Sequence, residues 1–146
     1  MTIKYFGFPG IKMNMLKDSK IDLWELNRAK PIECFEIVKK TVCQYYGINP
    51  EDLHSSKRDH PLPVAKQLFS YITKIKLFPN VSIRVIGEFI GTNRRTKKPY
   101  DRTTVMHGIQ EIKNKLFTKE YTEENIDDIV ESTRIHFTKL WNQYKS

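Results

Sequence analysis

The sequence reads Asp101-Arg102-Thr103-Thr104-Val105-Met106-His107 shortly after the basic run Arg94-Arg95-Thr96-Lys97-Lys98. Asp101 is a residue type that begins helices, because its carboxylate can accept a hydrogen bond from a free backbone N–H of the first turn. Apolar residues then recur at steps of three and four: Val105, Ile109, Ile112 and Leu116. This pattern predicts a helix over 102–116 that buries one face and leaves its polar amino end outside.

A helix that starts with hydrogen-bonding side chains beside a cluster of cations is suited to the major groove of DNA, whose base edges offer donors, acceptors and methyl groups. The net charge of +8 is concentrated around this helix, since residues 62–116 hold eleven Lys or Arg and three Asp or Glu. Such a basic region favours a polyanionic partner. The alternative is a lysine-rich surface that is only solvated.

Length and cysteine content limit the class of protein. A chain of 146 residues, 39% of them apolar, can build one modest core, which argues against a two-domain enzyme. Cys34 and Cys43 are nine residues apart on one expected helix, about 13 Å along its axis, which is too far for a disulfide. We expect both to be reduced, buried thiols of an intracellular protein.

Metal binding and secretion are not indicated either. The sequence has four histidines, His54, His60, His107 and His136. Their spacing is not that of a zinc finger, and we expect no metal and no cofactor. The first ten residues are broken by Pro9 and Gly10 and match neither a signal peptide nor a membrane span. We therefore expect a cytoplasmic, nucleoid-associated protein.

Periodicity, caps and breakers predict an all-α fold. Helices are expected over 32–46, from Pro63 to before Pro79, over 83–90, over 102–116 and from Thr122 onwards, with a single helical turn through Leu53. The apolar face of the first is expected to comprise Ile32, Phe35, Val38, Val42 and Tyr45. Residues 1–30 are expected to be extended, then to form a short helix or strand that packs Trp24 on the main body. Residues 55–61 are expected to form an exposed basic loop.

Two features of these helices concern packing. Gly87 costs its helix up to about 1 kcal/mol relative to alanine, which indicates close approach of another backbone, as helix–turn–helix pairs require. The last helix carries a stripe at alternating steps of four and three: Ile126, Val130, Thr133, Phe137, Leu140 and Tyr144. With fewer than three heptads, the stripe favours a helix that covers the domain's own core over a dimer seam.

Short motifs run from Val38 to Leu116. They are Tyr45-Tyr46-Gly47-Ile48 with Asp52-Leu53, Ser56-Lys57-Arg58, the helix from Pro63, Ile86-Gly87-Glu88-Phe89-Ile90-Gly91, and Asp101 to His107 followed by Ile112. This order resembles the C-terminal DNA-binding domain of the bacterial replication initiator DnaA, whose signature in the last motif is Asp-His-(Thr/Ser)-Thr-Val-hydrophobe-His. The resemblance implies an all-helical, Trp-repressor-like helix–turn–helix bundle, here with an extra C-terminal helix, and binding to double-stranded DNA of defined sequence.

The resemblance also implies roles for single residues. In the family the residue at Asp101 reaches a cytosine amino group, while Thr103 and Thr104 can offer hydroxyls and methyls to DNA. Arg102 replaces the family's usual histidine and could pair with guanine through two hydrogen bonds, so the preferred site is expected to differ. His107 either contacts DNA or holds the turn through a backbone contact.

Two departures from the family's pattern affect the expected basic contacts. Residues 92–100 separate the two helices, where the family has one or two residues. This turn either lies along the phosphates or reaches into the minor groove, or it is a disordered, solvated loop. The family also carries a minor-groove arginine just before the proline that opens a helix, whereas here Leu62 precedes Pro63. His60 or nearby cations would have to substitute. The expected loop contacts are Lys57, Arg58, Arg94, Arg95, Lys97 and Lys98.

The sequence contains no Gly-x-x-x-x-Gly-Lys-(Ser/Thr) phosphate loop, so we expect a stand-alone DNA-binding module that is not an enzyme. Its expected parts are an extension over 1–30, a DNA-binding domain over 31–121 and a C-terminal helix over 122–146 packed on the core. Acids that a nuclease would need, Asp101, Glu88 and Glu111, are explained better as a cap and as solvated-face residues. The alternative is a protein–protein interaction module that keeps the helix–turn–helix as scaffold and binds a partner, or a second copy, through its C-terminal helix.

Overall fold

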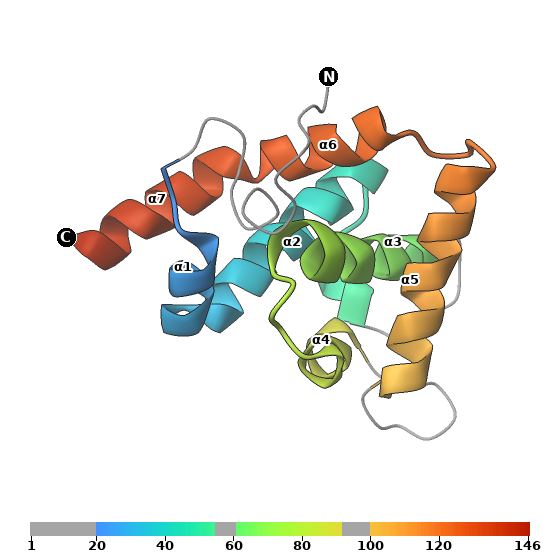
Figure 1. Cartoon of the computed structure of the whole chain (residues 1–146), viewed down its shortest axis with the longest axis horizontal. Helices are drawn as coiled ribbons and strands as arrows, with labels where there is room; N and C mark the ends of the chain where they lie inside the picture. Colours follow the sequence, from blue (N-terminus) through green and yellow to red (C-terminus); the bar gives the residue numbers. More distant parts are fainter. Residues whose placement is uncertain (1–19, 55–60, 92–99) are drawn as a thin grey trace.

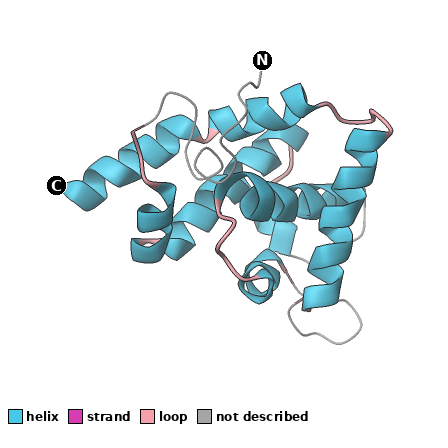
Figure 2. Ribbon diagram, viewed as in Figure 1, coloured by secondary structure: helices cyan, strands magenta, loops and turns pink. Residues whose placement is uncertain are grey.

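The computed structural model describes residues 20–54, 61–91 and 100–146, and these residues are helical with no strand among them (Figures 1 and 2). The elements in chain order are α1 (Leu23–Ala29), α2 (Pro31–Tyr46), the 3-10 turn η2 (Pro50–His54), α3 (Leu62–Tyr71), its π-helical continuation η3 (Ile72–Leu77), α4 (Ile83–Ile90), α5 (Arg102–Phe117), α6 (Glu123–Ser132) and α7 (Arg134–Lys145). The expected all-α helix–turn–helix bundle with extra C-terminal helical structure is confirmed.

Helix α2 begins and ends where the sequence indicates. Pro31 occupies its first turn, and Gly47 ends it with φ 69, donating its N–H to the carbonyls of Cys43 and Gln44. This left-handed conformation favours glycine, which has no Cβ to clash. The expected apolar face is wrong at both ends, because Ile32 is 58% exposed and Tyr45 48% exposed. The buried residues of α2 all lie between Cys34 and Cys43, so Ile32 and Tyr45 lie outside the core.

Aromatic rings join the helices in the core. Phe35 of α2 packs edge-on against Phe78, with ring centroids 6.3 Å apart, and Phe78 in turn packs edge-on against Phe137 of α7 at 5.9 Å. Phe69 of α3 stacks on Phe89 of α4 at 5.5 Å. The DNA-binding helices expected from the sequence and the C-terminal helices therefore share one core.

The short helix predicted near residue 24 is present, but its tryptophan does not pack as expected. Trp24 is 37% exposed, with the Arg28 guanidinium 5.8 Å from its ring, while Leu23 and Leu26 are fully buried. Asp22 caps α1 through the N–H of Glu25, and a helix starting there turns Leu23 and Leu26 to the core side and Trp24 outwards.

The C-terminal segment is two helices, not the single long helix predicted from Thr122. Thr122 does cap α6, in a capping box with Asn125. The break occurs at Thr133, whose N–H and hydroxyl both donate to the carbonyl of Val130, three residues back, so that the four-residue helical step is interrupted. Ile126 and Phe137 are buried, as expected for a segment that covers its own core.

Contacts also cross the expected domain boundaries. Helix α1 packs on α2 and α7, where the Tyr144 hydroxyl donates to Glu25 at 3.0 Å and the Lys145 ammonium lies 2.9 Å from the same carboxylate. The boundaries at residues 30 and 121 remain predictions. Among the described helices, none is both long and apolar enough to span a bilayer.

Candidate nucleic-acid interface

The amino end of α5 is a capped, exposed helix terminus. Asp101 has extended backbone angles, φ −84 and ψ 175, and its Oδ1 accepts a hydrogen bond from the Thr104 N–H at 2.9 Å. That N–H, and then the Thr104 hydroxyl, hold the pKa of the Asp101 carboxyl below its ordinary value. Asp101 therefore stays ionised, and its exposed carboxylate can accept further hydrogen bonds. Arg102, Thr103 and Thr104 are all exposed beside it.

The two faces of α5 differ as the sequence predicted. Val105, Ile109 and Ile112 are buried against the bundle. On the outer face the exposed side chains include those of Met106, His107 and Gln110. Gln110 donates its amide N–H to Asn114 Oδ1 at 3.1 Å, a contact within the third and fourth turns that no motif pointed to. The outer face thus offers both polar and apolar groups along three turns.

The two helices of the helix–turn–helix, α4 and α5, meet at Gly87. A Cβ on Gly87 would lie 2.4 Å from the carbonyl oxygen of Tyr100 and 3.2 Å from a methyl of Val105. The close backbone approach expected at this glycine is therefore confirmed. Only a residue without a side chain allows the start of α5 to lie this close to α4.

The connection between α4 and α5 is closed at its base. The Tyr100 N–H donates to the Gly91 carbonyl at 3.2 Å, so the chain leaves α4 and returns to α5 at neighbouring points. Residues 92–99 lie between these two points and outside the described residues. The longer connection thus leaves the pairing of α4 with α5 in place.

A buried lysine lies beneath the start of α5. Lys66 of α3 is 5% exposed, and its ammonium donates to the Tyr100 hydroxyl at 3.1 Å while lying 5.1 Å from the centroid of the same ring. The sequence did not identify either residue, because a lysine within a helix is usually solvated and its partner is 34 residues away. Lys66 is nonetheless connected to the start of α5 by its hydrogen bond to Tyr100, the residue before the Asp101 cap.

A groove of about 650 Å³ runs between α3 and α5, next to this contact. Thr104 and His107 border it from α5, and Lys66 and Gln67 from α3. Gly108 allows the two helices to cross closely, since a Cβ there would lie 3.2 Å from Gln67 Cγ. His107 therefore lies at the edge of the helix–helix contact and also on the exposed side of α5.

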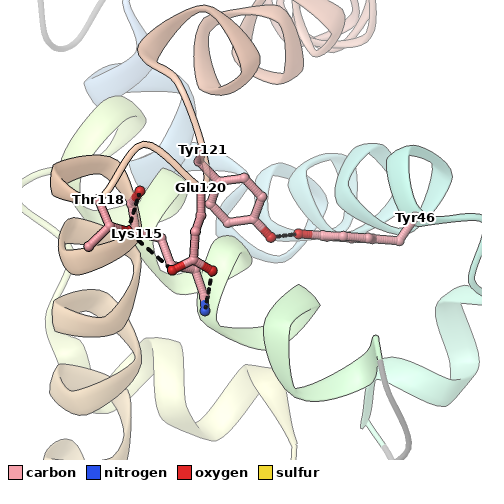
Figure 3. A network of polar contacts seen from close by, with 5 residues as sticks. All are labelled: Tyr46, Lys115, Thr118, Glu120 and Tyr121. Atoms are coloured by element: carbon pink, nitrogen blue, oxygen red, sulfur yellow. Dashed lines mark hydrogen bonds and ion pairs between the residues drawn. The ribbon is translucent and has the colours of Figure 1, made fainter.

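The far end of α5 is fixed by a polar network (Figure 3). The hydroxyls of Tyr46, on α2, and Tyr121, just after α5, form a hydrogen bond with each other. Glu120 lies between the Lys115 ammonium, at 3.7 Å, and the Thr118 hydroxyl, at 3.1 Å. Helix α5 is therefore held at both ends by side chains from other parts of the fold.

Six of the predicted contact residues cannot be placed, since they fall outside the described residues: Lys57, Arg58, Arg94, Arg95, Lys97 and Lys98. The same holds for His60. The structure brings together the other five, Asp101, Arg102, Thr103, Thr104 and His107, within the first two turns of α5.

The acids considered for catalysis lie at three different positions along α4 and α5. Asp101 is the α5 cap, and Glu88 lies 3.9 Å from Arg84 on the outside of α4. Glu111 borders the groove between α3 and α5. Within residues 20–54, 61–91 and 100–146, no group of three or more His, Cys, Asp or Glu side chains is arranged to hold a metal ion.

Comparison with known proteins agrees with this geometry. The family model described as the bacterial dnaA protein helix-turn-helix matches residues 35–112, from the first buried phenylalanine of α2 to Ile112 of α5. The match covers more than half of the chain and includes both the Gly87 contact and the capped start of α5.

Relatives with curated names match the same part of the chain. The chromosomal replication initiator protein DnaA of Aromatoleum aromaticum is 35% identical over 103 residues, which is 70% of this chain and 19% of that protein. Proteins of the same name from Thermoanaerobacter sp. and Caldanaerobacter subterraneus are each 28% identical over 94 residues, 64% of this chain and again 19% of theirs. No solved structure matches the sequence.

Proposed function

The chain belongs to the family of bacterial DnaA helix–turn–helix domains, and from this premise we propose that it binds double-stranded DNA and reads a defined sequence through the amino end of α5. One observation carries the proposal beyond the family. The first turn of α5 presents Arg102, Thr103 and Thr104 to solvent behind a capped terminus, next to the most basic part of the chain. This is the arrangement that a helix needs to enter the major groove with its end towards the bases.

Each exposed group has a chemical role in this proposal. Arg102 donates two hydrogen bonds to guanine O6 and N7, and the exposed carboxylate of Asp101 accepts one from a cytosine amino group. Thr103 and Thr104 offer hydroxyls to bases or phosphates and methyls to thymine. Because Asp101 is ionised, it repels phosphates and is placed favourably only where it faces a donor on a base. This requirement restricts the orientation of the helix.

The cations of the two loops are proposed to bind phosphates. Gly91 and Tyr100 meet at the base of the connection, beside the start of α5, so Arg94, Arg95, Lys97 and Lys98 belong to a segment that starts and ends next to the proposed base-reading residues. Lys57 and Arg58 are proposed for the same role on sequence alone. Contacts of this kind contribute affinity and salt dependence but little base discrimination.

The proposal is tested by selecting bound duplexes from a random pool and measuring their affinity by fluorescence anisotropy. We expect Arg102→Ala and Thr104→Ala to reduce the preference for the selected site by roughly 5- to 150-fold, the effect of losing one good base contact. Lys97→Ala should instead weaken binding similarly on all duplexes and reduce the slope of log K against log salt by about 1.

Lys139→Ala is the matched control, because Lys139 is an exposed lysine of α7 and the same charge is removed away from α5. It should leave both the preference and the affinity close to those of the unaltered protein. Absence of binding to any duplex at about 100 mM salt, where phosphate contacts are still strong, would overturn the proposal and favour the protein-interaction module.

A further inference from the structure

We propose that Lys66 and Tyr100 form a positioning pair that fixes the start of α5 and thereby sets the orientation of the base-reading side chains. The inference rests on the proposed DNA-binding function, and it assigns a role to two residues that do not themselves contact bases. It follows from three separate contacts that converge on Tyr100.

The first contact is made by the Tyr100 side chain. The Lys66 ammonium donates to the Tyr100 hydroxyl at 3.1 Å and lies 5.1 Å from the ring centroid, and Lys66 is 5% exposed. A buried ammonium is costly unless hydrogen bonds and other electrostatic contacts compensate for lost water. Moving Tyr100 away would therefore remove a contact that this buried charge needs, and Lys66 opposes such a movement.

The other two contacts are made by the Tyr100 main chain. Its N–H donates to the Gly91 carbonyl at 3.2 Å, and its carbonyl lies against Gly87, where a Cβ would come within 2.4 Å of the oxygen. Tyr100 is thus held by α3 through its side chain and by α4 through its backbone.

The position of Tyr100 determines where the proposed base-reading residues lie, because they follow it directly in the chain. The next residue, Asp101, caps α5 by accepting from the Thr104 N–H at 2.9 Å, and Arg102 is the first residue of the helix. A shift of Tyr100 moves Asp101 with it and changes where Arg102 lies relative to a base pair. Hydrogen bonds to base edges depend strongly on distance and angle, so even a small shift lowers discrimination.

The length of the connection explains why such a pair is needed. A turn of one or two residues fixes the start of the next helix by covalent geometry alone, whereas residues 92–99 add eight residues between α4 and Tyr100. Covalent geometry alone fixes the two ends of a longer connection less closely, so noncovalent contacts made at those ends have a larger effect. Lys66 and Tyr100 supply such a contact from α3, which lies outside the lengthened connection.

The test uses Tyr100→Phe and Lys66→Met in the full chain. Tyr100→Phe keeps the ring over the ammonium and removes only the hydroxyl, and Lys66→Met keeps the length of the side chain and removes the charge. We expect each to lower the ratio of affinities for the selected and a random duplex by about three- to tenfold. The salt dependence should stay the same, because no phosphate contact is removed. The double variant should lose little more than Lys66→Met alone, since the Tyr100 hydroxyl has already lost its lysine partner in that variant.

A second readout does not need DNA. Amide hydrogen exchange of the Thr104 N–H in the free protein reports the Asp101 cap, and we expect faster exchange in both variants. Tyr46→Phe is the matched control, because it removes a tyrosine hydroxyl that holds the opposite end of α5. It should lower stability while leaving the affinity ratio and the Thr104 exchange rate unchanged.

The outcomes separate the inference from the proposed function. If the unaltered protein shows no duplex preference, the proposed function fails, and the exchange rates of Thr104 alone decide whether the pair positions α5. If it does show a preference and Tyr100→Phe retains the full ratio, the pair is only structural and the inference is wrong. Should Lys66→Met fail to fold, Tyr100→Phe decides the matter.

Discussion

Asp101 has two roles that substitutions can separate. Its carboxylate caps α5, and its pKa is held below the ordinary value by the Thr104 N–H and hydroxyl. A lowered pKa in the folded state means that the carboxylate stabilises the fold fully above its ordinary pKa, and that this contribution is lost as pH falls through the lower, folded value. Asn is as good a cap as Asp, whereas Ala is a poor one.

We therefore predict that Asp101→Ala lowers the urea midpoint of unfolding at pH 7 and that Asp101→Asn does not. The difference between Asp101→Ala and the unaltered protein should shrink as pH falls below about 4, where the carboxylate of the unfolded chain becomes protonated, and should be lost below the lower pKa of the folded state. Circular dichroism during urea titration at pH 7 and pH 3 measures both effects. Asp101→Asn should still weaken binding to the selected duplex, because the carboxylate that accepts a hydrogen bond from the cytosine amino group is replaced by an amide. Equal urea midpoints for Asp101→Ala and the unaltered protein at pH 7 would contradict the capping role.

Gly87 and Gly108 allow the close packing of α5 to different degrees. A Cβ on Gly87 would lie 2.4 Å from a backbone oxygen, that of Tyr100, which cannot move without moving the start of α5. A Cβ on Gly108 would lie 3.2 Å from Gln67 Cγ, which belongs to a flexible side chain. Both substitutions gain up to about 1 kcal/mol of helix propensity.

The prediction is that Gly87→Ala destabilises the protein by about 1–3 kcal/mol, because the overpacking exceeds the gain in propensity. Gly108→Ala, as the matched control at the contact of α5 with α3, should change the free energy of unfolding by less than about 1 kcal/mol. Thermal and urea unfolding of the two variants provide the comparison. A neutral or stabilised Gly87→Ala would show that α4 and α5 are not held as close as the Tyr100 contact indicates.

Helix α7 contributes to the core through one face and leaves the other exposed. Phe137 is fully buried and packs edge-on against Phe78 at 5.9 Å, whereas Ile135, two residues earlier, is 68% exposed. We predict that Phe137→Ala lowers the free energy of unfolding by about 3–5 kcal/mol. Ile135→Ala should change it by no more than about 0.5 kcal/mol.

Chemical denaturation, at two protein concentrations, checks this prediction. If α7 packs only on the core of its own chain, neither the denaturation midpoint nor the effect of Phe137→Ala depends on protein concentration. A concentration-dependent midpoint that Ile135→Ala abolishes would instead indicate that the exposed face of α7 is a dimer contact.

The helices could be predicted from the sequence where local signals mark their ends. Pro31 and Gly47 bound α2, Ser82 caps α4 and Asp101 caps α5, and each of these signals acts through atoms within a few residues. The break at Thr133 was missed because apolar periodicity runs through it unchanged. It depends on a hydroxyl that takes the carbonyl of Val130, and threonine does this in some helices only.

The site was predictable to a similar extent. The capped, exposed start of α5 follows from the motif itself, and the close approach at Gly87 follows from a glycine in a short helix. Lys66 was missed because its burial depends on Tyr100, 34 residues away and beyond a long connection. Trp24 was placed wrongly because large apolar residues are usually buried, and only the cap at Asp22 fixes which side of α1 faces inwards.

Alkaline pH should destabilise the whole protein through acids buried in its shared core. Burial raises the pKa of Cys34 from 9.0 to about 12, that of Cys43 from 9.0 to about 11 and that of Tyr71 from 10.0 to about 12. Burial and the Tyr121 hydroxyl also raise the pKa of Tyr46. Each group must stay neutral in the fold but ionises at lower pH in the unfolded chain. Its contribution is therefore complete below the unfolded pKa and is lost as pH rises through the folded one.

We predict that the free energy of unfolding is nearly constant between pH 7 and 9 and falls between pH 9 and 12, the interval that these raised pKa values define. The double variant Cys34→Ala, Cys43→Ala isolates the thiols, because lysines and tyrosines titrate in it as before. It should be less stable than the unaltered protein at pH 7, and between pH 9 and 12 it should lose less stability than the unaltered protein, by on the order of 6 kcal/mol. Urea unfolding at several pH values measures the difference. Parallel pH profiles for the two proteins would mean that the thiols titrate alike in the folded and unfolded chains, and so that Cys34 and Cys43 are open to water.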